Sequence, residues 1–241
     1  MARRMFYVQE VRGEVAFLRG ETALHLRKVL RGEQGQRYEI SDGSTRWLAE
    51  LEGFGKDQAE FRLLEALDSP APPARIHLFP ALIKFDHFEW MLEKATELGV
   101  ERITPVYSLR CEKGLDLAAG KRMERWRRIL YESGQQSRRL RPPSLDEPVQ
   151  LKAALSLDCL LRLWLEEEGK ARPILRVVAT GFSEAALLCG PEGGWEEKER
   201  LEAGNAGWLP VSLGKQILRA ETAVLAAMAI VMARAQCEGE G

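Results

Sequence analysis

Two short glycine-containing stretches hold the residues whose types and spacing could do chemistry. Residues 190–194 (Gly-Pro-Glu-Gly-Gly) follow one apolar stretch, and Leu213-Gly214 ends another. Glycine adopts positive φ and lets a ligand approach the backbone without a Cβ in the way. Two such loops at neighbouring strand ends predict a cleft lined by main-chain groups, where open α/β sheets hold ligands. A purely structural tight turn is the alternative for the first loop alone.

The residues around these loops exclude two common nucleotide-binding motifs and single out one arginine. No Gly-Lys-Ser/Thr follows residues 190–194, and the loop is not GxGxxG, so a P-loop or Rossmann enzyme is disfavoured. Glu221, at the start of the predicted last helix, suits the helix dipole and can be a plain stabiliser. Arg219 is a cation at the same end, where the dipole is unfavourable to it. Arg219 is therefore a candidate functional residue.

A basic segment runs from residue 121 to residue 141. Only Glu124 and Glu132 oppose its positive charges, which are Lys121, Arg122, Arg125, Arg127, Arg128, Arg138, Arg139 and Arg141. Such a run is often no more than a solvated helix face. Arginine forks also bind phosphate bidentately, and the interleaved Trp126 and Tyr131 can address bases. The segment therefore predicts binding to a polyanion.

The second part of the chain alternates strands with helices and positions the glycine loops. Apolar runs predict strands at residues 76–83, 103–107, 159–165, 185–189 and 209–213. Asp86 and Glu89 are spaced as a capping box for a helix that Gly99 ends, and a basic helix is expected from about Lys121 to Ser133. This alternation predicts a mostly parallel sheet with helices on both faces.

The first 70 residues predict a small barrel of short strands. Apolar residues recur with a period of two at Phe6, Val15, Tyr38, Trp47 and Ala59 and their partners two residues on. Residues 42–43 (Asp-Gly) are typical of a type I′ hairpin turn, and a short helix is expected with residue 22 (Thr) as its N-cap. Three prolines within residues 69–73 indicate a linker.

Composition limits the classes of protein to which the chain can belong. The 35 basic and 36 acidic residues give a formal net charge of −1, so nucleic-acid binding must be local. The longest apolar run, residues 223–233, is shorter than the about 20 residues that span a bilayer, and no secretory signal is visible. The four cysteines and three histidines do not cluster. We expect a cytoplasmic protein with no metal and no membrane contact.

Together these motifs resemble the RsmE-type 16S ribosomal RNA uridine-N3 methyltransferases of the SPOUT superfamily. The similarity covers essentially the whole chain: residues 190–195 with Glu199, 213–223, Lys84, 94–100 and 132–139, and, near the start, 25–26, 29–31 and Gly35. Two positions depart from the family pattern, with Trp195 where Phe is common and Ala220 where Thr is common.

The resemblance implies a fold, a cofactor and partners. The fold would be α/β, with a PUA-like RNA-binding β-barrel at residues 1–70 and a SPOUT domain with a trefoil knot at residues 74–241. The protein would be a homodimer that uses S-adenosylmethionine to methylate N3 of one uridine in 16S ribosomal RNA of the small subunit. Two alternatives stay open: a SPOUT methyltransferase of another RNA site, and a non-catalytic RNA-binding protein of ribosome assembly.

The resemblance also assigns roles to residues. Arg219 would stabilise charge on the uracil, and Glu221, or else Glu192, would accept the N3 proton. The residues expected to hold the cofactor are Leu188, Gly190, Gly193, Leu213, Gly214, Ile217 and Leu218. Those expected to bind RNA are Arg31, Lys84, Arg125, Arg138 and Arg139.

Overall fold

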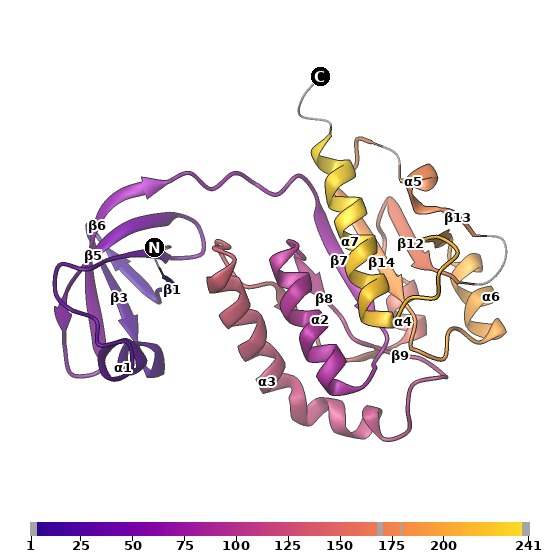
Figure 1. The fold of residues 1–241 in the computed structure, drawn as a ribbon, viewed down its shortest axis with the longest axis horizontal. Coiled ribbons are helices and arrows are strands. Elements are labelled where there is room, and N and C mark those ends of the chain that lie inside the picture. The colour runs from indigo at the N-terminus through magenta and orange to yellow at the C-terminus, as the bar shows by residue number, and fades with distance from the viewer. Residues whose placement is uncertain (1–3, 168–170, 179, 238–241) are drawn as a thin grey trace. The chain divides into compact units, whose positions relative to one another are not determined.

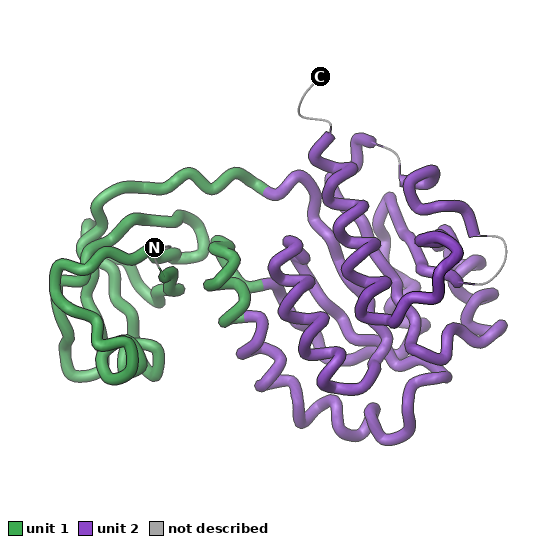
Figure 2. Tube along the Cα trace, in the orientation of Figure 1, with its two compact units in different colours: residues 1–71, 131–142 green, residues 72–130, 143–241 purple. Residues whose placement is uncertain are grey.

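The computed structural model describes residues 4–167, 171–178 and 180–237. The chain forms two compact units, drawn in different colours in Figure 2. Unit 1 comprises Met1–Ala71 and Tyr131–Pro142, and unit 2 comprises Pro72–Leu130 and Pro143–Gly241. Each unit has its own hydrophobic core. The domain boundaries 1–70 and 74–241 stay a prediction.

Unit 1 is built on a curled sheet, the half-barrel form of the predicted small barrel (Figure 1). Its strands pair in the order β1-β4-β5-β6-β3-β2, with β1 parallel to β4 and the other neighbours antiparallel. The elements are β1 (Met5–Tyr7), β2 (Glu10–Arg12), β3 (Val15–Arg19), α1 (Glu21–Lys28), β4 (Arg37–Ser41), β5 (Arg46–Phe54) and β6 (Gln58–Leu67).

The period of two places its apolar residues in the core, with one exception. Ile40, Leu51 and Phe61 are fully buried as expected. On β3 the inward residues are Ala16 and Leu18, whereas the expected pair, Val15 and Phe17, is only half-buried. A strand turned by one residue exchanges its two faces, and here the guanidinium groups of neighbouring arginines cover the Phe17 ring.

Local turn and cap chemistry in unit 1 differs from the expectation in two places. The hairpin between β4 and β5 is present, but only Gly43 has positive φ (89°), so the turn is not type I′. Instead Asp42 Oδ1 accepts hydrogen bonds from the backbone N–H groups of Ser44 and Thr45, each at 2.8 Å. Helix α1 begins one residue before Thr22, and its N-cap is Gly20, whose φ of 68° suits glycine.

Unit 2 contains the predicted parallel sheet, with strand order β10-β8-β7-β14-β12-β15-β13 and a separate β9–β11 pair. The strands are β7 (Arg75–Pro80), β8 (Arg102–Ile103), β9 (Val106–Tyr107), β10 (Ser144–Leu145), β11 (Val149–Gln150), β12 (Leu161–Leu165), β13 (Arg172–Pro173), β14 (Glu184–Cys189) and β15 (Leu209–Ser212). The helices are α2 (Phe85–Glu97), α3 (Leu115–Gln136, whose residues from Tyr131 on belong to unit 1), α4 (Leu151–Leu155), α5 (Ile174–Val177), α6 (Glu197–Asn205) and α7 (Ala220–Gln236).

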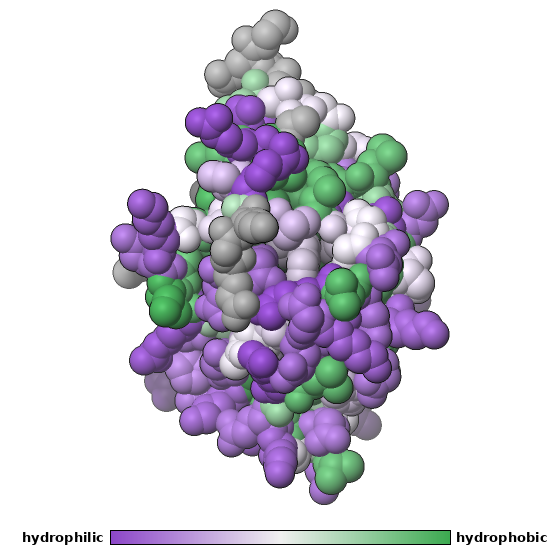
Figure 3. Space-filling view, turned by 90° about the vertical axis from the view of Figure 1, so that its right-hand side faces the viewer, coloured by the Kyte–Doolittle hydropathy of each residue, from purple (hydrophilic) through white to green (hydrophobic). Residues whose placement is uncertain are grey.

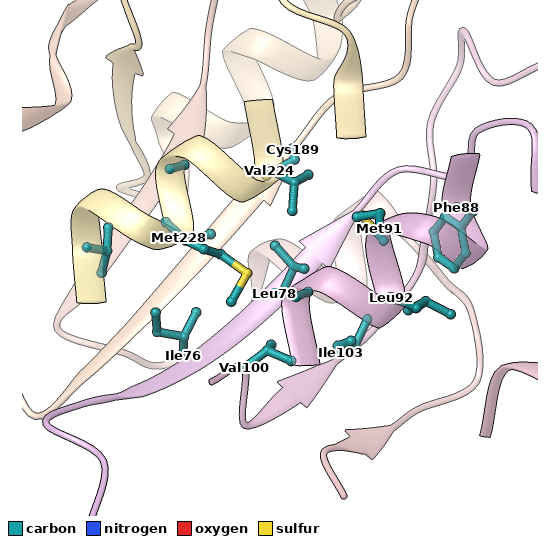
Figure 4. Packing of buried hydrophobic residues seen from close by; sticks show 14 of the residues in the cluster. Ile76, Leu78, Phe88, Met91, Leu92, Val100, Ile103, Cys189, Val224 and Met228 are labelled. Carbon is teal, nitrogen blue, oxygen red and sulfur yellow. The ribbon is translucent and has the colours of Figure 1, made fainter. Parts of the chain in front are cut away.

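Helices cover both faces of this sheet, as predicted. On one face, α2, α3 and α7 pack over β7, β8 and β14, and Figure 4 shows Met91, Val224 and Met228 reaching toward this core. On the other face, α4 and α6 pack over β7, β12 and β14 around Trp208. Strand β14 serves both cores, because Leu187 points to the first and Leu188 to the second.

The structure changes two expectations about the helices of unit 2. The capping box expected at Asp86 and Glu89 is absent, since α2 begins at Phe85 with no side-chain cap; the capping box belongs to α6, between Glu196 and Glu199. Trp126 cannot address bases, because it is fully buried against Phe88 with ring centroids 4.6 Å apart. The basic residues from Lys121 to Arg128 therefore lie on the outer side of the amphipathic helix α3, whereas Arg138, Arg139 and Arg141 follow its end.

Candidate active site

A pocket opens at the carboxyl ends of β14, β12 and β15 in unit 2. It holds about 840 Å³, a volume that includes the open solvent at its mouth. The two glycine loops line one pocket, although β12 separates β14 from β15, so their strands are not direct neighbours. The wall consists of the last residue of β12 and the two residues after it (165–167), of the first loop (Gly190, Pro191, Glu192, Gly194, Trp195), of the second loop (213–218) and of α7 (Ala220, Ala223), together with Cys189, Val211 and Ser212.

The first loop depends on close packing between Gly190 and Trp195. A Cβ on Gly190 would lie 3.0 Å from the Trp195 ring, closer than side chains normally approach. The buried Trp195 ring in turn donates its Nε1–H to the Leu165 carbonyl at 3.0 Å. Trp195 therefore ties the first loop to the end of β12. Glycine is also required at Gly194, whose φ is 69°.

A second segment, after β9, holds the first loop from the other side. Arg110 donates through Nη1 to the Gly193 carbonyl at 2.8 Å and through Nε to Glu196 Oε1 at 2.7 Å. This hydrogen bond from Arg110 lowers the pKa of Glu196. The buried Glu199 accepts the backbone N–H groups of Leu109 and Glu196, both at 2.9 Å. Arg110 was not predicted from the sequence, where its only signal is its place just after a strand end.

The predicted cofactor residues fall into two groups. Five of them line the pocket: Gly190, Leu213, Gly214, Ile217 and Leu218. The other two lie off its wall, because the Leu188 side chain packs in the core on the α4–α6 face and Gly193 is turned toward Arg110. The binding roles of all seven stay a prediction.

The wall also carries charged side chains, one of which, Glu192, is the second predicted acceptor of the N3 proton. Glu166 is 8% exposed and binds Arg200 Nε at 2.8 Å. Glu167 and Glu192 are exposed, and neither makes a hydrogen bond or ion pair with a residue that the structure describes. Lys215 is the basic residue of this wall. The wall is therefore acidic on balance.

The two predicted catalytic residues lie at the start of α7, outside the wall of the pocket. Arg219 is the N-cap residue; its side chain is exposed and pairs with no described residue. Glu221 is only 6% exposed, and its Oε1 lies 2.9 Å from Nδ1 of His87 on α2. Sequence reasoning missed His87, whose one signal is its position beside the apolar face of α2. The catalytic roles stay a prediction.

The predicted RNA-binding residues are divided between the units. In unit 1, Arg31 is exposed with φ of 51°, and Arg138 Nη2 lies 3.6 Å from Glu39 Oε1. Arg139, the residue after Arg138, is half-buried. In unit 2, Lys84 is an exposed N-cap of α2, and Arg125 donates to Glu89 Oε2 at 2.8 Å. Their contacts with RNA stay predictions.

Residues 4–167, 171–178 and 180–237 contain no group of three or more His, Cys, Asp or Glu side chains placed to hold a metal ion. Within the same ranges, no helix is long and apolar enough to cross a membrane.

Comparison with known proteins places the chain in a family. A family model described as RNA methyltransferase domain matches residues 70–232. The ribosomal RNA small subunit methyltransferase E of Synechocystis is 33% identical over 97% of this chain and 78% of its own length. The enzyme of the same name from Rickettsia conorii is 30% identical over 86% of this chain and 84% of its own.

A solved structure agrees with the sequence relatives. Ribosomal RNA small subunit methyltransferase E of Neisseria gonorrhoeae, crystallised with S-adenosylmethionine, is 30% identical. Its TM-score is 0.86, and the match covers 96% of this chain and 98% of that one. The chain therefore belongs to the ribosomal RNA small subunit methyltransferase E family of RNA methyltransferases.

Proposed function

We propose that the protein transfers the methyl group of S-adenosylmethionine to N3 of one uridine in 16S ribosomal RNA, acting on the small subunit in the cytoplasm. The observation that carries this proposal is the pocket formed by the two glycine loops, in a chain that matches a cofactor-bound relative over almost its whole length.

The residues of the pocket fit S-adenosylmethionine. Leu213, Leu218 and the 88% exposed Ile217 offer an apolar surface for an adenine ring. The carboxylates of Glu167 and Glu192, which pair with no residue that the structure describes, suit the positive charge of a sulfonium and an ammonium group. A bound sulfonium supplies an activated methyl group, so the protein has to hold the two reactants in line and manage the proton on N3.

The position and exposure of the Arg219 side chain allow it to contact the RNA substrate. Its guanidinium is exposed beside two pocket residues, Leu218 and Ala220, and no described side chain neutralises it. A cation there would stabilise the negative charge that develops on the uracil oxygens as N3 loses its proton. Of the two carboxylates proposed as proton acceptor, Glu192 lines the pocket, whereas Glu221 faces His87.

The decisive experiment maps the modification. Small subunits from a strain that lacks this chain are incubated with the purified protein and labelled S-adenosylmethionine, and the modified position is read by reverse transcription. An N3 methyl group blocks the Watson–Crick edge, so one new stop at a uridine is expected. A methylated ribose or another RNA would instead identify a different SPOUT activity. Absence of cofactor binding in calorimetry would leave a non-catalytic assembly protein.

We also propose that two copies of the chain pair through the α2–α7 face. Trp90 on α2 is 47% exposed, and α7 is apolar around most of its circumference, with Ala229 and Ala233 exposed. On the side that carries α5 and α6, hydrophobic residues are scattered among hydrophilic ones (Figure 3). Sedimentation of the wild-type protein should give twice the chain mass of 27.2 kDa. Because Trp90→Glu places a charge in the apolar interface, this variant should sediment with a mass closer to that of a single chain.

A further inference from the structure

The hydrogen bond between His87 and Glu221 joins the first turns of two helices that are far apart in the chain. Helices α2 and α7 pack against each other on one face of the sheet. Each follows a strand of the parallel sheet, so both begin at the carboxyl edge where the pocket opens. His87 Nδ1 and Glu221 Oε1 lie 2.9 Å apart. A carboxylate oxygen only accepts, so the imidazole donates from Nδ1.

The turn that this bond holds carries functional groups on both sides of Glu221. Arg219 precedes it as the N-cap, and Ala220 and Ala223 form the α7 part of the pocket wall. Glu221 is 6% exposed and has no other hydrogen bond or ion pair with a described residue. A buried carboxylate without its donor is costly, so loss of His87 would favour rearrangement of this turn.

We propose that His87 is a positioning residue, which fixes the first turn of α7 through Glu221 so that Arg219 and the pocket wall keep one arrangement during methyl transfer. The proposal rests on the proposed function, because it assigns a task within that reaction. It gives Glu221 the role of hydrogen-bond acceptor for His87 and removes it as the acceptor of the N3 proton.

Two substitutions of His87 differ in whether the hydrogen-bond donor at the position of Nδ1 is kept. The amide nitrogen of Asn occupies nearly the place of Nδ1, so His87→Asn keeps the donor, whereas His87→Ala removes it. His87→Ala should lower kcat by between about tenfold and a hundredfold, the range expected when a reacting group is displaced by about 1 Å. The Kd for S-adenosylmethionine should change by less than kcat. His87→Asn should restore most of the lost kcat, and Glu221→Gln should retain more activity than Glu221→Ala.

A second measurement needs neither cofactor nor RNA. Amide hydrogen exchange in residues 220–223 of the free protein should be faster in His87→Ala and return toward the wild-type rate in His87→Asn. Asp86→Asn is the matched control, because Asp86 is 81% exposed and its Oδ2 lies 3.8 Å from His87 Nε2. That control should leave both kcat and exchange unchanged.

The outcomes separate this proposal from its alternatives. Wild-type kcat and exchange in His87→Ala would overturn it. His87→Asn as inactive as His87→Ala would mean that Nε2 does the work, which makes the ring a proton acceptor. Inactive Glu221→Gln beside active His87→Asn would return the base role to Glu221. If the wild-type protein transfers no methyl group, the proposed function fails, and the exchange result still decides whether His87 fixes the turn.

Discussion

At the scale of single residues, the pocket depends on the side chain that Gly190 lacks. The sequence suggested that a larger residue there would project into the cleft. In the structure the first obstacle is Trp195, whose ring atoms Cε2 and Nε1 would be 3.0 Å from a Cβ at this position. The Trp195 ring would have to shift by a few tenths of an ångström, and this ring belongs to the wall and is hydrogen-bonded to the end of β12.

Gly190→Val should therefore weaken S-adenosylmethionine binding by distorting the wall as well as by occupying space. We expect the Kd in calorimetry to rise more than tenfold. Gly204→Ala is the control, since a Cβ there has no neighbour within 4 Å. Unchanged affinity in Gly190→Val would show that the cofactor binds elsewhere.

Replacing Arg219 should have the opposite effect, because the variant should still bind S-adenosylmethionine but lose methyl transfer. Because its side chain is exposed and lies off the pocket wall, Arg219→Ala should leave the Kd for S-adenosylmethionine within about tenfold. Methyl transfer should fall by about a hundredfold or more, as when a charge-stabilising donor is removed. Lys198→Ala, at a 78% exposed side chain on α6, should change neither value. Retained turnover in Arg219→Ala would remove this residue from the mechanism.

At the scale of elements, a polar network joins β7, β8 and the end of β10. His77 Nε2 lies 2.7 Å from Thr104 Oγ1, which also contacts Asp146, and Arg102 binds Asp146 through two hydrogen bonds of 2.7 and 2.9 Å. Burial, with help from Arg102, lowers the pKa of His77 from 6.5 to about 4. Burial alone would raise the pKa of Asp146, but hydrogen bonds from Arg102 and Thr104 outweigh it and lower the pKa.

The low pKa of His77 predicts an acid-sensitive stability. Below pH 6.5 the His77 imidazole binds a proton in the unfolded chain, whereas in the folded protein it binds one only near pH 4. Stability is therefore fully present above pH 6.5 and is lost as the pH falls toward 4. His77→Gln keeps a polar group near Thr104 without titrating, so its melting temperature should fall less over this window. Parallel melting curves for both proteins would exclude His77 as a source of acid sensitivity.

Elements also show which parts of the molecule could be predicted from the sequence. Strand runs and glycine loops are local signals, and they located β14, β15 and both pocket loops. The helical spacing of Met123, Trp126 and Leu130 is local too, and it marks the buried side of α3. Contacts between distant residues leave no such signal. The insertion of β12 between β14 and β15, and the pairing of His87 with a residue on α7, arise only when the chain folds.

At the scale of the whole molecule, a net charge of −1 means that affinity for RNA must come from local basic surfaces. Arg138 and Arg139 follow α3 and belong to unit 1, where Arg138 Nη2 lies 3.6 Å from Glu39 Oε1. Family membership and the cofactor-bound relative give the activity of the whole chain, whereas the trefoil knot implied by the resemblance stays a prediction.

Reversing both charges tests the predicted RNA surface. Arg138→Glu combined with Arg139→Glu should weaken binding to small-subunit RNA and flatten its dependence on salt. The slope of log affinity against log salt should shrink by about 0.7 for each phosphate that the protein no longer neutralises. Lys56→Glu, at an exposed position in the same unit, is the control. An unchanged slope in the double variant would place the RNA on another surface.

Unit 1 is assembled from two parts of the chain that are made at different times. The Tyr131 ring packs on Tyr7 with centroids 5.1 Å apart, and Ser41 Oγ donates to the Leu140 carbonyl at 2.6 Å. At a synthesis rate of roughly 5–20 residues per second, residues 131–142 leave the ribosome on the order of 3–12 seconds after residue 71. The curled sheet can form during that delay, but its last contacts wait for a segment that follows the first part of unit 2, Pro72–Leu130. The order of folding therefore differs from the order of synthesis.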